Sequence, residues 1–222
     1  MDFLALLVSS AVQVATPVAA CVVPPQVYVA VLMDDSAVQT RTDFTLAQLD
    51  AMRQETGGVD RHPTFGFYGH RFGYTVQIDI EHAEGSACVG SVKVGVHMVL
   101  SQRVIEIAKD LTQNPCLFAI AQAHYLRHAA ADNQVFAEYA RMIGPALRAT
   151  QLLPSQADYT VSSLQKADIE KLVRSSVDAT LVPYDAARRT AQLSVDTKAE
   201  AVKMISGCTS SAPPDTSPKG HS

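Results

Sequence analysis

The 222-residue sequence has no tryptophan, no basic cluster and no long apolar run beyond its first twenty positions. Lysine and arginine are scattered singly or in pairs such as Arg188-Arg189, and the net charge of −4 is mild, which argues against a nucleic-acid partner. The lack of a long apolar run argues against a membrane span after residue 20. The sequence also contains no P-loop, dinucleotide fingerprint or Ser-His-Asp motif, so the common nucleotide-binding and serine-hydrolase classes are not indicated.

Residues 1–20 resemble a secretory signal, although they lack its usual positive charge. An apolar block at Phe3–Val8 is followed by small residues at Val18 and Ala20, as at a signal-peptidase site before Cys21. We therefore predict a signal peptide over 1–20 and an exported protein, periplasmic or secreted. The alternative is an apolar first helix packed into the domain.

The rest of the chain is expected to form one domain over residues 21–208. Residues 209–222 are rich in Ser, Pro and Thr and cannot bury enough apolar surface to offset the entropy of ordering them. We predict that this segment is a disordered tail.

Strands are expected in the first half of the domain. Gln26–Met33 is rich in β-branched residues, and Gly73–Glu81 and Cys88–Leu100 alternate apolar and polar residues around a short turn. The last two segments predict an antiparallel hairpin with one buried face, and Arg103–Ala108 predicts a third strand. Because the strands precede the long helices, the fold class is α+β, with a small antiparallel sheet packed on a long helix.

That long helix is expected to begin at Asn114-Pro115, a good N-cap followed by a proline in the first turn, and to kink or end at Gly144-Pro145. Two further helices are expected. Ser163–Leu181 is stopped by Pro183, and Thr197–Ser206 opens with the capping-box sequence Asp196-Thr197-x-x-Glu200.

His124 and His128 stand four residues apart on the long helix and therefore share one face. This is how zinc hydrolases of the His-Glu-x-x-His type present two imidazoles to one metal ion. The position of the general-base glutamate is occupied by Tyr125. The spacing therefore indicates a zinc site without the group that takes the proton from zinc-bound water. Two ordinary helix-face histidines are the alternative interpretation.

Asp132 lies one turn beyond His128 and is the candidate third zinc ligand. A straight helix would carry it about 12 Å from His124, so the alternative is a solvated carboxylate. Weaker candidates are the turn residues Glu81, His82 and Glu84, and also His62, His70 and Arg71 in the glycine-rich stretch before the hairpin.

From about Pro24 to Cys208 the chain resembles a family of small exported proteobacterial proteins described as predicted secreted zinc proteases. The resemblance rests on the hairpin with Cys88, the Cys116-led helix with His124 and His128, and the Ser194–Cys208 segment. It implies a zincin-like domain with a zinc site. Tyr125 replaces the motif glutamate of that family.

These features favour an exported cell-envelope protein with a degenerate metallopeptidase-like domain, non-catalytic and binding zinc, whose partner is an unidentified envelope protein or peptide. One alternative is an active zinc hydrolase whose base comes from another loop, for instance Glu81 or Glu84. Another is a purely structural or interaction protein of the envelope.

The four cysteines form an even set, which favours two disulfides in an exported chain. We predict Cys88–Cys116, tying the hairpin to the long helix, and Cys21–Cys208, tying together the two ends of the domain. Val18-Ala19-Ala20-Cys21 also matches a lipoprotein cleavage box, so the alternative for Cys21 is a lipid anchor at the outer membrane.

Overall fold

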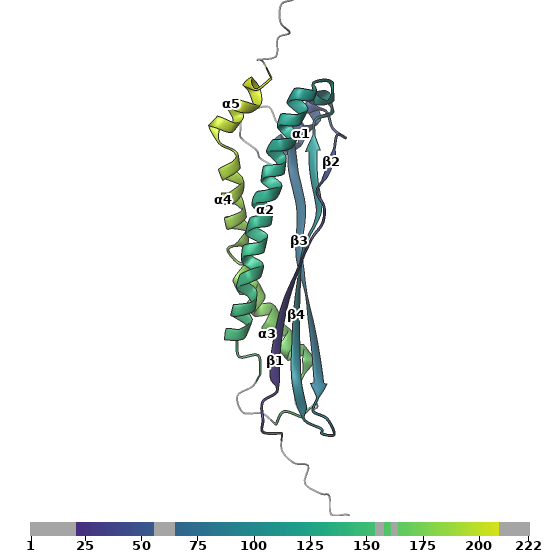
Figure 1. The fold of residues 1–222 in the computed structure, drawn as a ribbon, viewed down its shortest axis with the longest axis vertical. Helices are drawn as coiled ribbons and strands as arrows, with labels where there is room; N and C mark the ends of the chain where they lie inside the picture. Colours follow the sequence, from purple (N-terminus) through teal and green to yellow (C-terminus); the bar gives the residue numbers. More distant parts are fainter. Residues whose placement is uncertain (1–20, 56–64, 154–157, 161–163, 209–222) are drawn as a thin grey trace, which may run out of the picture.

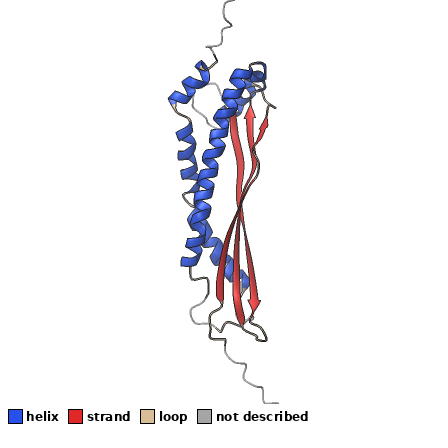
Figure 2. Ribbon diagram, viewed as in Figure 1, coloured by secondary structure: helices blue, strands red, loops and turns tan. Residues whose placement is uncertain are grey.

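The structure is a computed structural model that describes residues 21–55, 65–153, 158–160 and 164–208. These residues form an elongated two-layer molecule, with a sheet on one side and helices on the other (Figures 1 and 2). The class is therefore α+β, as predicted. The predicted signal peptide and the predicted disordered tail lie outside the described residues.

Four strands form the sheet: β1 (Gln26–Asp35), β2 (Gln39–Arg41), β3 (Gly66–His82) and β4 (Val89–Ile107). The long strand β4 pairs with each of the other three. It pairs antiparallel with β3, which confirms the predicted hairpin, but parallel with β1 and with β2. The sheet is therefore mixed, and the expectation of an antiparallel sheet is wrong for β1. The predicted third strand after residue 103 is the end of β4 itself.

The parallel pairing of β1 has a simple origin in the chain path. After β1 the chain continues in the same direction through β2, forms α1 (Leu46–Glu55), and only then returns along β3. A parallel pair needs a long connection of this kind, whereas an antiparallel pair can be closed by a tight turn. The strand periodicity of β1 carries no information on its direction.

The helical layer is dominated by α2 (Pro115–Ala149), a 35-residue helix that is roughly 52 Å long at 1.5 Å per residue. Its start agrees with the prediction, because the Asn114 side chain accepts a hydrogen bond from the Leu117 amide at 3.2 Å. The helix does not end at Gly144-Pro145, because it continues through Pro145 to Ala149. Before it lies the short 3₁₀ helix η1 (Lys109–Gln113), and after it come α3 (Lys166–Leu181), α4 (Tyr184–Val195) and α5 (Lys198–Ser206).

The main apolar core fills the half of the molecule nearest the β3–β4 turn. The face of β4 that the alternating pattern predicted to be buried is fully covered, with Val92, Val96 and Met98 at 0% exposure. Helix α3 and the second half of α2 pack on this face. The buried helical residues of this core are Phe136, Ala140, Ile143, Leu147, Ile169, Val173 and Val177. We call this half, from the β3–β4 turn to Phe136, the apolar half.

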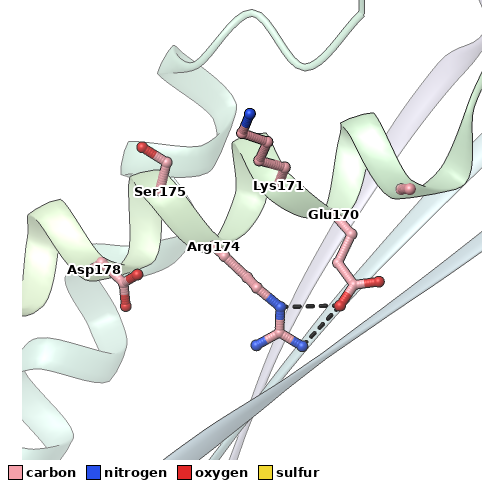
Figure 3. Close-up of a pocket in the computed structure, with 6 residues that line it drawn as sticks. Glu170, Lys171, Arg174, Ser175 and Asp178 are labelled. Atoms are coloured by element: carbon pink, nitrogen blue, oxygen red, sulfur yellow. Dashed lines mark hydrogen bonds and ion pairs between the residues drawn. The ribbon is translucent and has the colours of Figure 1, made fainter.

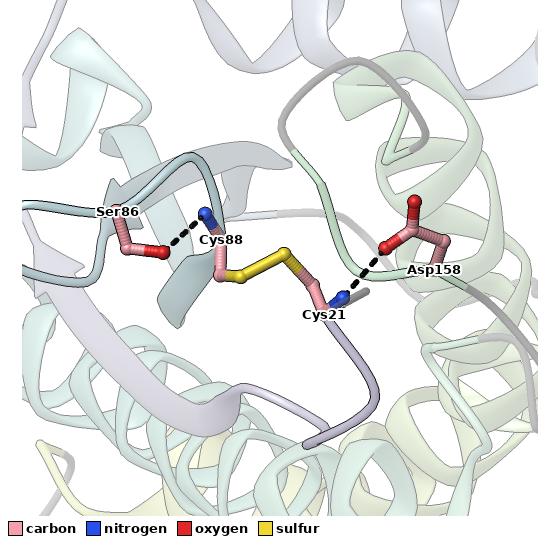
Figure 4. The surroundings of a disulfide bond; sticks show 4 residues. All are labelled: Cys21, Ser86, Cys88 and Asp158. Carbon is pink, nitrogen blue, oxygen red and sulfur yellow. Dashed lines mark hydrogen bonds between the residues drawn. A yellow bond between two sulfur atoms is a disulfide. The ribbon is translucent and has the colours of Figure 1, made fainter. Parts of the chain in front are cut away.

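The disulfides are Cys21–Cys88 and Cys116–Cys208, with Cα–Cα distances of 5.4 and 5.8 Å, so both predicted pairings are wrong. Because β1 and β4 run in parallel, the residues just before them lie side by side, and this brings Cys21 to Cys88 (Figure 4). Cys116 begins α2 and Cys208 follows α5 at the opposite end of the molecule (Figure 1). The two ends of the domain were expected to be close together, but they lie far apart.

Cys21 is well integrated into the fold. Its side chain is bonded to Cys88, and its amide donates to the Asp158 carboxylate at 2.9 Å (Figure 4). Its carbonyl accepts from the Tyr159 amide at 2.9 Å. The disulfide uses the sulfur atom that a lipid anchor would require. The structure therefore supports the disulfide at Cys21 and not the lipid.

Candidate functional site

The first half of α2 turns polar side chains towards the interior. His124, His128 and Asp132 are 3%, 7% and 0% exposed, although aspartate is mostly found at the surface and histidine is intermediate. Their four-residue spacing places them on the side of α2 that faces the sheet and α4. Buried polar groups of this kind are stable only when each has a partner.

His124 and His128 meet Asp196, which is the C-cap of α4. The Nε2 atoms of the two histidines lie 3.0 Å apart. The Asp196 Oδ1 atom lies 3.2 Å from the His124 Nε2 atom and 3.0 Å from that of His128. Three potential ligand atoms thus form a nearly equilateral triangle. We call these residues the His–His–Asp cluster.

Hydrogen atoms cannot satisfy all three sides of this triangle. With one proton, on either imidazole Nε2, that nitrogen can donate to its two neighbours, but the remaining pair consists of two acceptors. With a proton on both nitrogens, each can donate to Asp196, but the two N–H groups then face each other. A cation near the centre, in contrast, attracts all three lone pairs at once.

The triangle has dimensions that suit zinc. For sides of 3.0–3.2 Å, a point roughly 1 Å above the plane lies 2.0–2.1 Å from all three atoms, the usual Zn–N and Zn–O distance. Two imidazoles and a carboxylate are also a ligand set that zinc accepts. Because the Asp196 side chain is 51% exposed, one side of the cluster is open to solvent.

The electrostatics also favour a charged cluster. Hydrogen bonds from His124 and from His128 hold the pKa of Asp196 far below its usual range, so the carboxylate is ionised throughout the physiological range. An ionised aspartate is the form that coordinates a metal.

The other ring nitrogen of each histidine has a neighbour. The His128 Nδ1 atom is hydrogen-bonded to the Gln192 Oε1 atom of α4. The His124 Nδ1 atom lies 3.4 Å from the Arg127 Nη2 atom, and that guanidinium also pairs with Glu200 of α5. Groups from α2, α4 and α5 therefore surround the cluster.

Asp132, the predicted third ligand, lies outside the cluster. Its Oδ2 atom is 2.7 Å from the His70 Nδ1 atom, and its Oδ1 atom accepts from the Arg188 Nε atom at 3.1 Å. Burial by itself would raise the pKa of Asp132, but the His70 hydrogen bond and the Arg188 charge outweigh it and lower the pKa. Asp132 thus belongs to a separate ion-pair group, which connects to the cluster through Gln192.

Tyr125 occupies the place of a general base but has a structural role. Its side chain is 8% exposed and its hydroxyl donates to the Gly66 carbonyl at 2.6 Å, so the hydroxyl is not at the surface. Burial, followed by the charge of Asp196, raises the pKa of Tyr125 well above its usual value. A phenol that does not ionise cannot serve as a base. Gly66 leaves room for this contact, since a Cβ there would lie 2.8 Å from the Tyr125 ring.

The candidate bases from other loops are remote. Tyr125 touches Gly66 at the start of β3, while Glu81 lies near the other end of this 17-residue strand, where it pairs with Lys93. At about 3.3 Å per residue, β3 separates them by roughly 50 Å. Glu84 is in the turn that follows. His62 lies outside the described residues, and His82 and Arg71 are exposed.

A surface hollow of about 560 Å³ lies away from the cluster, along one face of α3. Figure 3 shows Glu170 and Arg174 paired to each other there, with Lys171, Ser175 and Asp178 alongside. It is lined by one helix, and among its acidic residues Asp178 accepts a hydrogen bond from Tyr74. It brings no groups from separate elements together.

The sequence does not predict Asp196 as a ligand, because the approach of Asp196 depends on α4, a helix that the sequence pattern does not predict. Pro183 predicts the end of a helix, but proline is also common at the start of one, and α4 begins at Tyr184. Asp196 was assigned to the cap of the last helix. Instead the Thr197 hydroxyl accepts from the Glu200 amide at 3.3 Å, so the Asp196 carboxylate remains available to the histidines. The sequence Thr197-x-x-Glu200 is itself a capping box, which indicates that Thr197 and not Asp196 caps α5.

No protein-family model matches this chain, and neither a curated protein nor a solved structure is similar to it at a significant level. Within the described residues, no helix is both long enough and apolar enough to cross a membrane.

Proposed function

We propose that this protein is an exported cell-envelope protein that binds one zinc ion through His124, His128 and Asp196, without hydrolysing a substrate. The observation that carries the proposal is the triangle of three ligand atoms at 3.0–3.2 Å, which no set of protons satisfies. Export is supported by the two disulfides, since disulfides persist in oxidising compartments.

The non-catalytic part of the proposal rests on Tyr125. Zinc-bound water needs a nearby group to take its proton, and a general base is worth about 10²–10⁴-fold in rate. The residue that follows His124 is a buried phenol directed at Gly66. The zincin-like fold implied by the family resemblance is part of this proposal and rests on the sequence motif.

Three protein ligands would leave a bound zinc ion an open coordination position, and the exposed Asp196 side chain makes the cluster accessible from solvent. We propose that a side chain or terminus of an envelope protein or peptide occupies it. A site that binds without a base holds its ligand and does not turn it over.

Zinc content is the decisive measurement. We expect one equivalent in protein purified without an affinity His tag and equilibrated with micromolar zinc. His124→Ala and Asp196→Ala should each lose it, whereas His82→Ala, a change at an exposed histidine beside the distant turn, should retain it. Failure of the folded wild-type protein to bind zinc would refute the proposal and favour a purely structural or interaction role.

The alternative function is an active zinc hydrolase, favoured by the same open coordination position. Its base would have to come from a residue other than Glu81 or Glu84, which lie at the far end of the sheet. This alternative would be established by a peptidase activity that is absent in His124→Ala. In the wild-type protein the same activity should be lost when the metal is removed and should return when zinc is added.

A further inference from the structure

Strand β1 forms an edge of the sheet with an apolar surface. Within the described part of the chain, β1 pairs only with β4, so alternate residues direct their backbone N–H and C=O groups away from the sheet. Four large apolar side chains of this strand are between 39% and 62% exposed, namely Val27, Tyr28, Leu32 and Met33. An edge of this kind is a template for pairing with a further strand.

The opposite edge of the sheet, strand β3, has charged side chains that hinder such pairing. Its exposed positions include Arg71, Asp79 and Glu81. Strand β1, in contrast, carries no charged side chain from Gln26 to Met33. The two edges therefore differ, and only β1 has the composition of a strand that is covered by a partner.

The exposed side chains of β1 are arranged symmetrically about Ala30. Two copies of β1 can pair antiparallel across a twofold axis through Ala30. Tyr28 then lies opposite Leu32 of the second copy. Val27 likewise lies opposite Met33. Each large exposed apolar side chain of β1 thus gains an apolar partner.

This register also keeps each side chain on its own face of the sheet. Tyr28 lies beside the exposed Lys93 of β4, so the even-numbered residues of β1 are on the outer face. Val27 lies beside the fully buried Val92, so the odd-numbered residues are on the inner face. Opposite residues of an antiparallel pair lie side by side on one face, and an axis at Ala30 joins even with even and odd with odd.

Charge favours the antiparallel arrangement. Asp34 and Asp35, at the end of β1, come opposite Gln26 and Pro25 of the second copy. A parallel pair of two β1 strands would instead set each aspartate against its own copy, and like charges directly opposite each other are destabilising.

A basic side chain lies beside the start of β1. Arg148 of α2 lines a hollow of about 330 Å³ together with Pro24 and Val27. Arg148 is exposed and makes no ion pair within the described ranges. Met33 and Asp35 of the second copy, both on the inner face, approach this hollow in the antiparallel pair. The apolar wall then meets a thioether side chain, and the guanidinium meets a carboxylate.

We propose that the protein forms a dimer with a second copy of itself, in which the two β1 strands pair antiparallel about Ala30 and join the two sheets into one. A twofold interface of this kind is closed, so the assembly stops at two copies. None of the residues of the His–His–Asp cluster lies on β1, so dimer formation does not require zinc.

The first test measures the molecular mass of the disulfide-bonded protein by light scattering after size-exclusion chromatography. We expect the wild type to have twice the mass of one chain. Ala30→Lys, a change at an exposed residue, places two like charges opposite each other on the axis and should give the mass of one chain. Leu172→Lys, at an exposed leucine of α3, is the matched control and should remain a dimer.

A second test examines the register. All four native cysteines are in disulfides, so Ala30→Cys introduces a single free thiol. Opposite Cα atoms of an antiparallel pair lie about 4.5–5.5 Å apart, so mild oxidation should give a covalent dimer. In Leu32→Cys the two thiols would be roughly 13 Å apart along the strands, so this variant should not be cross-linked.

The charge contact gives a third readout. Arg148→Glu should raise the dissociation constant of the dimer by about threefold to tenfold, whereas Arg189→Glu, at an exposed arginine of α4, should leave it unchanged. A monomeric wild type, or a dimer that persists in folded Ala30→Lys, overturns the proposal. Cross-linking of Leu32→Cys without cross-linking of Ala30→Cys also overturns it, because the axis would then lie elsewhere.

Discussion

The two halves of α2 solve the same packing problem in opposite ways. From Phe136 to Leu147 the helix buries apolar residues against β4, as most helices do. From His124 to Asp132 it buries two imidazoles and a carboxylate against α4 and the sheet. We call this second region, His124–Asp132 with the groups it contacts, the polar half.

The difference shows where stability and function reside. Burying charged and polar groups costs free energy unless each is paired, so the polar half contributes little to stability by itself. The larger apolar core lies in the apolar half, and a smaller apolar cluster around Ile105, Ile107 and Leu111 packs beside the start of α2; these two clusters supply the hydrophobic driving force. The fold can therefore tolerate the His–His–Asp cluster, in which one pair of atoms lacks a hydrogen bond, because its stability comes from the apolar residues.

The largest effect should come from restoring the missing base. In zinc-loaded Tyr125→Glu we expect peptide hydrolysis to rise by about 10²–10⁴-fold from a near-zero baseline, because the variant regains a carboxylate beside His124. Activity is measured with a fluorogenic peptide library. Tyr125→Gln, which loses the same Gly66 hydrogen bond but has no base, is the control. No gain in a folded, zinc-loaded variant would show that other parts of the active site are also missing.

Removing one disulfide at a time should affect zinc binding differently in the two halves. The bridges close 67 and 92 residues, for which the chain-entropy model gives about 4–5 kcal/mol each. We expect both double Cys→Ser variants to be less stable by a similar amount in denaturant titrations. Only Cys116→Ser with Cys208→Ser should weaken zinc binding, because that bridge ties α5, and with it the Arg127–Glu200 pair, to α2. Equal zinc affinities would contradict this division.

A cavity in the apolar half should lower stability and leave the metal site intact. Ile143 is fully buried, so Ile143→Ala should reduce the free energy of unfolding by about 2–5 kcal/mol. Its neighbour Met142 is 39% exposed, and Met142→Ala should cost much less. Chemical denaturation measures the free energy of unfolding of both variants, and zinc titration measures their zinc affinity. A loss of zinc affinity in Ile143→Ala would mean that the halves are coupled.

The smallest effect should be the pH dependence due to Asp132. Because its folded-state pKa is lowered, ionised Asp132 stabilises the fold above its unfolded pKa of about 3.9, and this contribution disappears as the pH falls through the folded-state value. We expect Asp132→Asn to lose about 1–3 kcal/mol at pH 7 and progressively less below pH 4. Asp185→Asn, an exposed carboxylate on α4, should show no such trend. Urea unfolding at several pH values checks both.

Local sequence signals predicted local structure well. The alternation along β3 and β4, the Asn114 cap and the shared face of His124 and His128 all follow from residues close together in the chain. The direction of β1 and the pairing of residues far apart in the chain could not be predicted from local signals. The direction of β1 depends on a connection of many residues, and the cysteine pairs and the approach of Asp196 depend on where distant elements pack.

The central position of β4 has a consequence for how the chain folds. Within the described part of the chain, every other strand pairs with β4, and only β3 is joined to it by a short turn. The β3–β4 hairpin can therefore form early, whereas β1 must find its place along β4 across a separation of more than sixty residues, as Gln26 opposite Ser91 shows. Loop closure on this scale slows folding. Oxidation of Cys21 with Cys88 fixes that encounter, so we expect refolding to be slower when the cysteines are kept reduced.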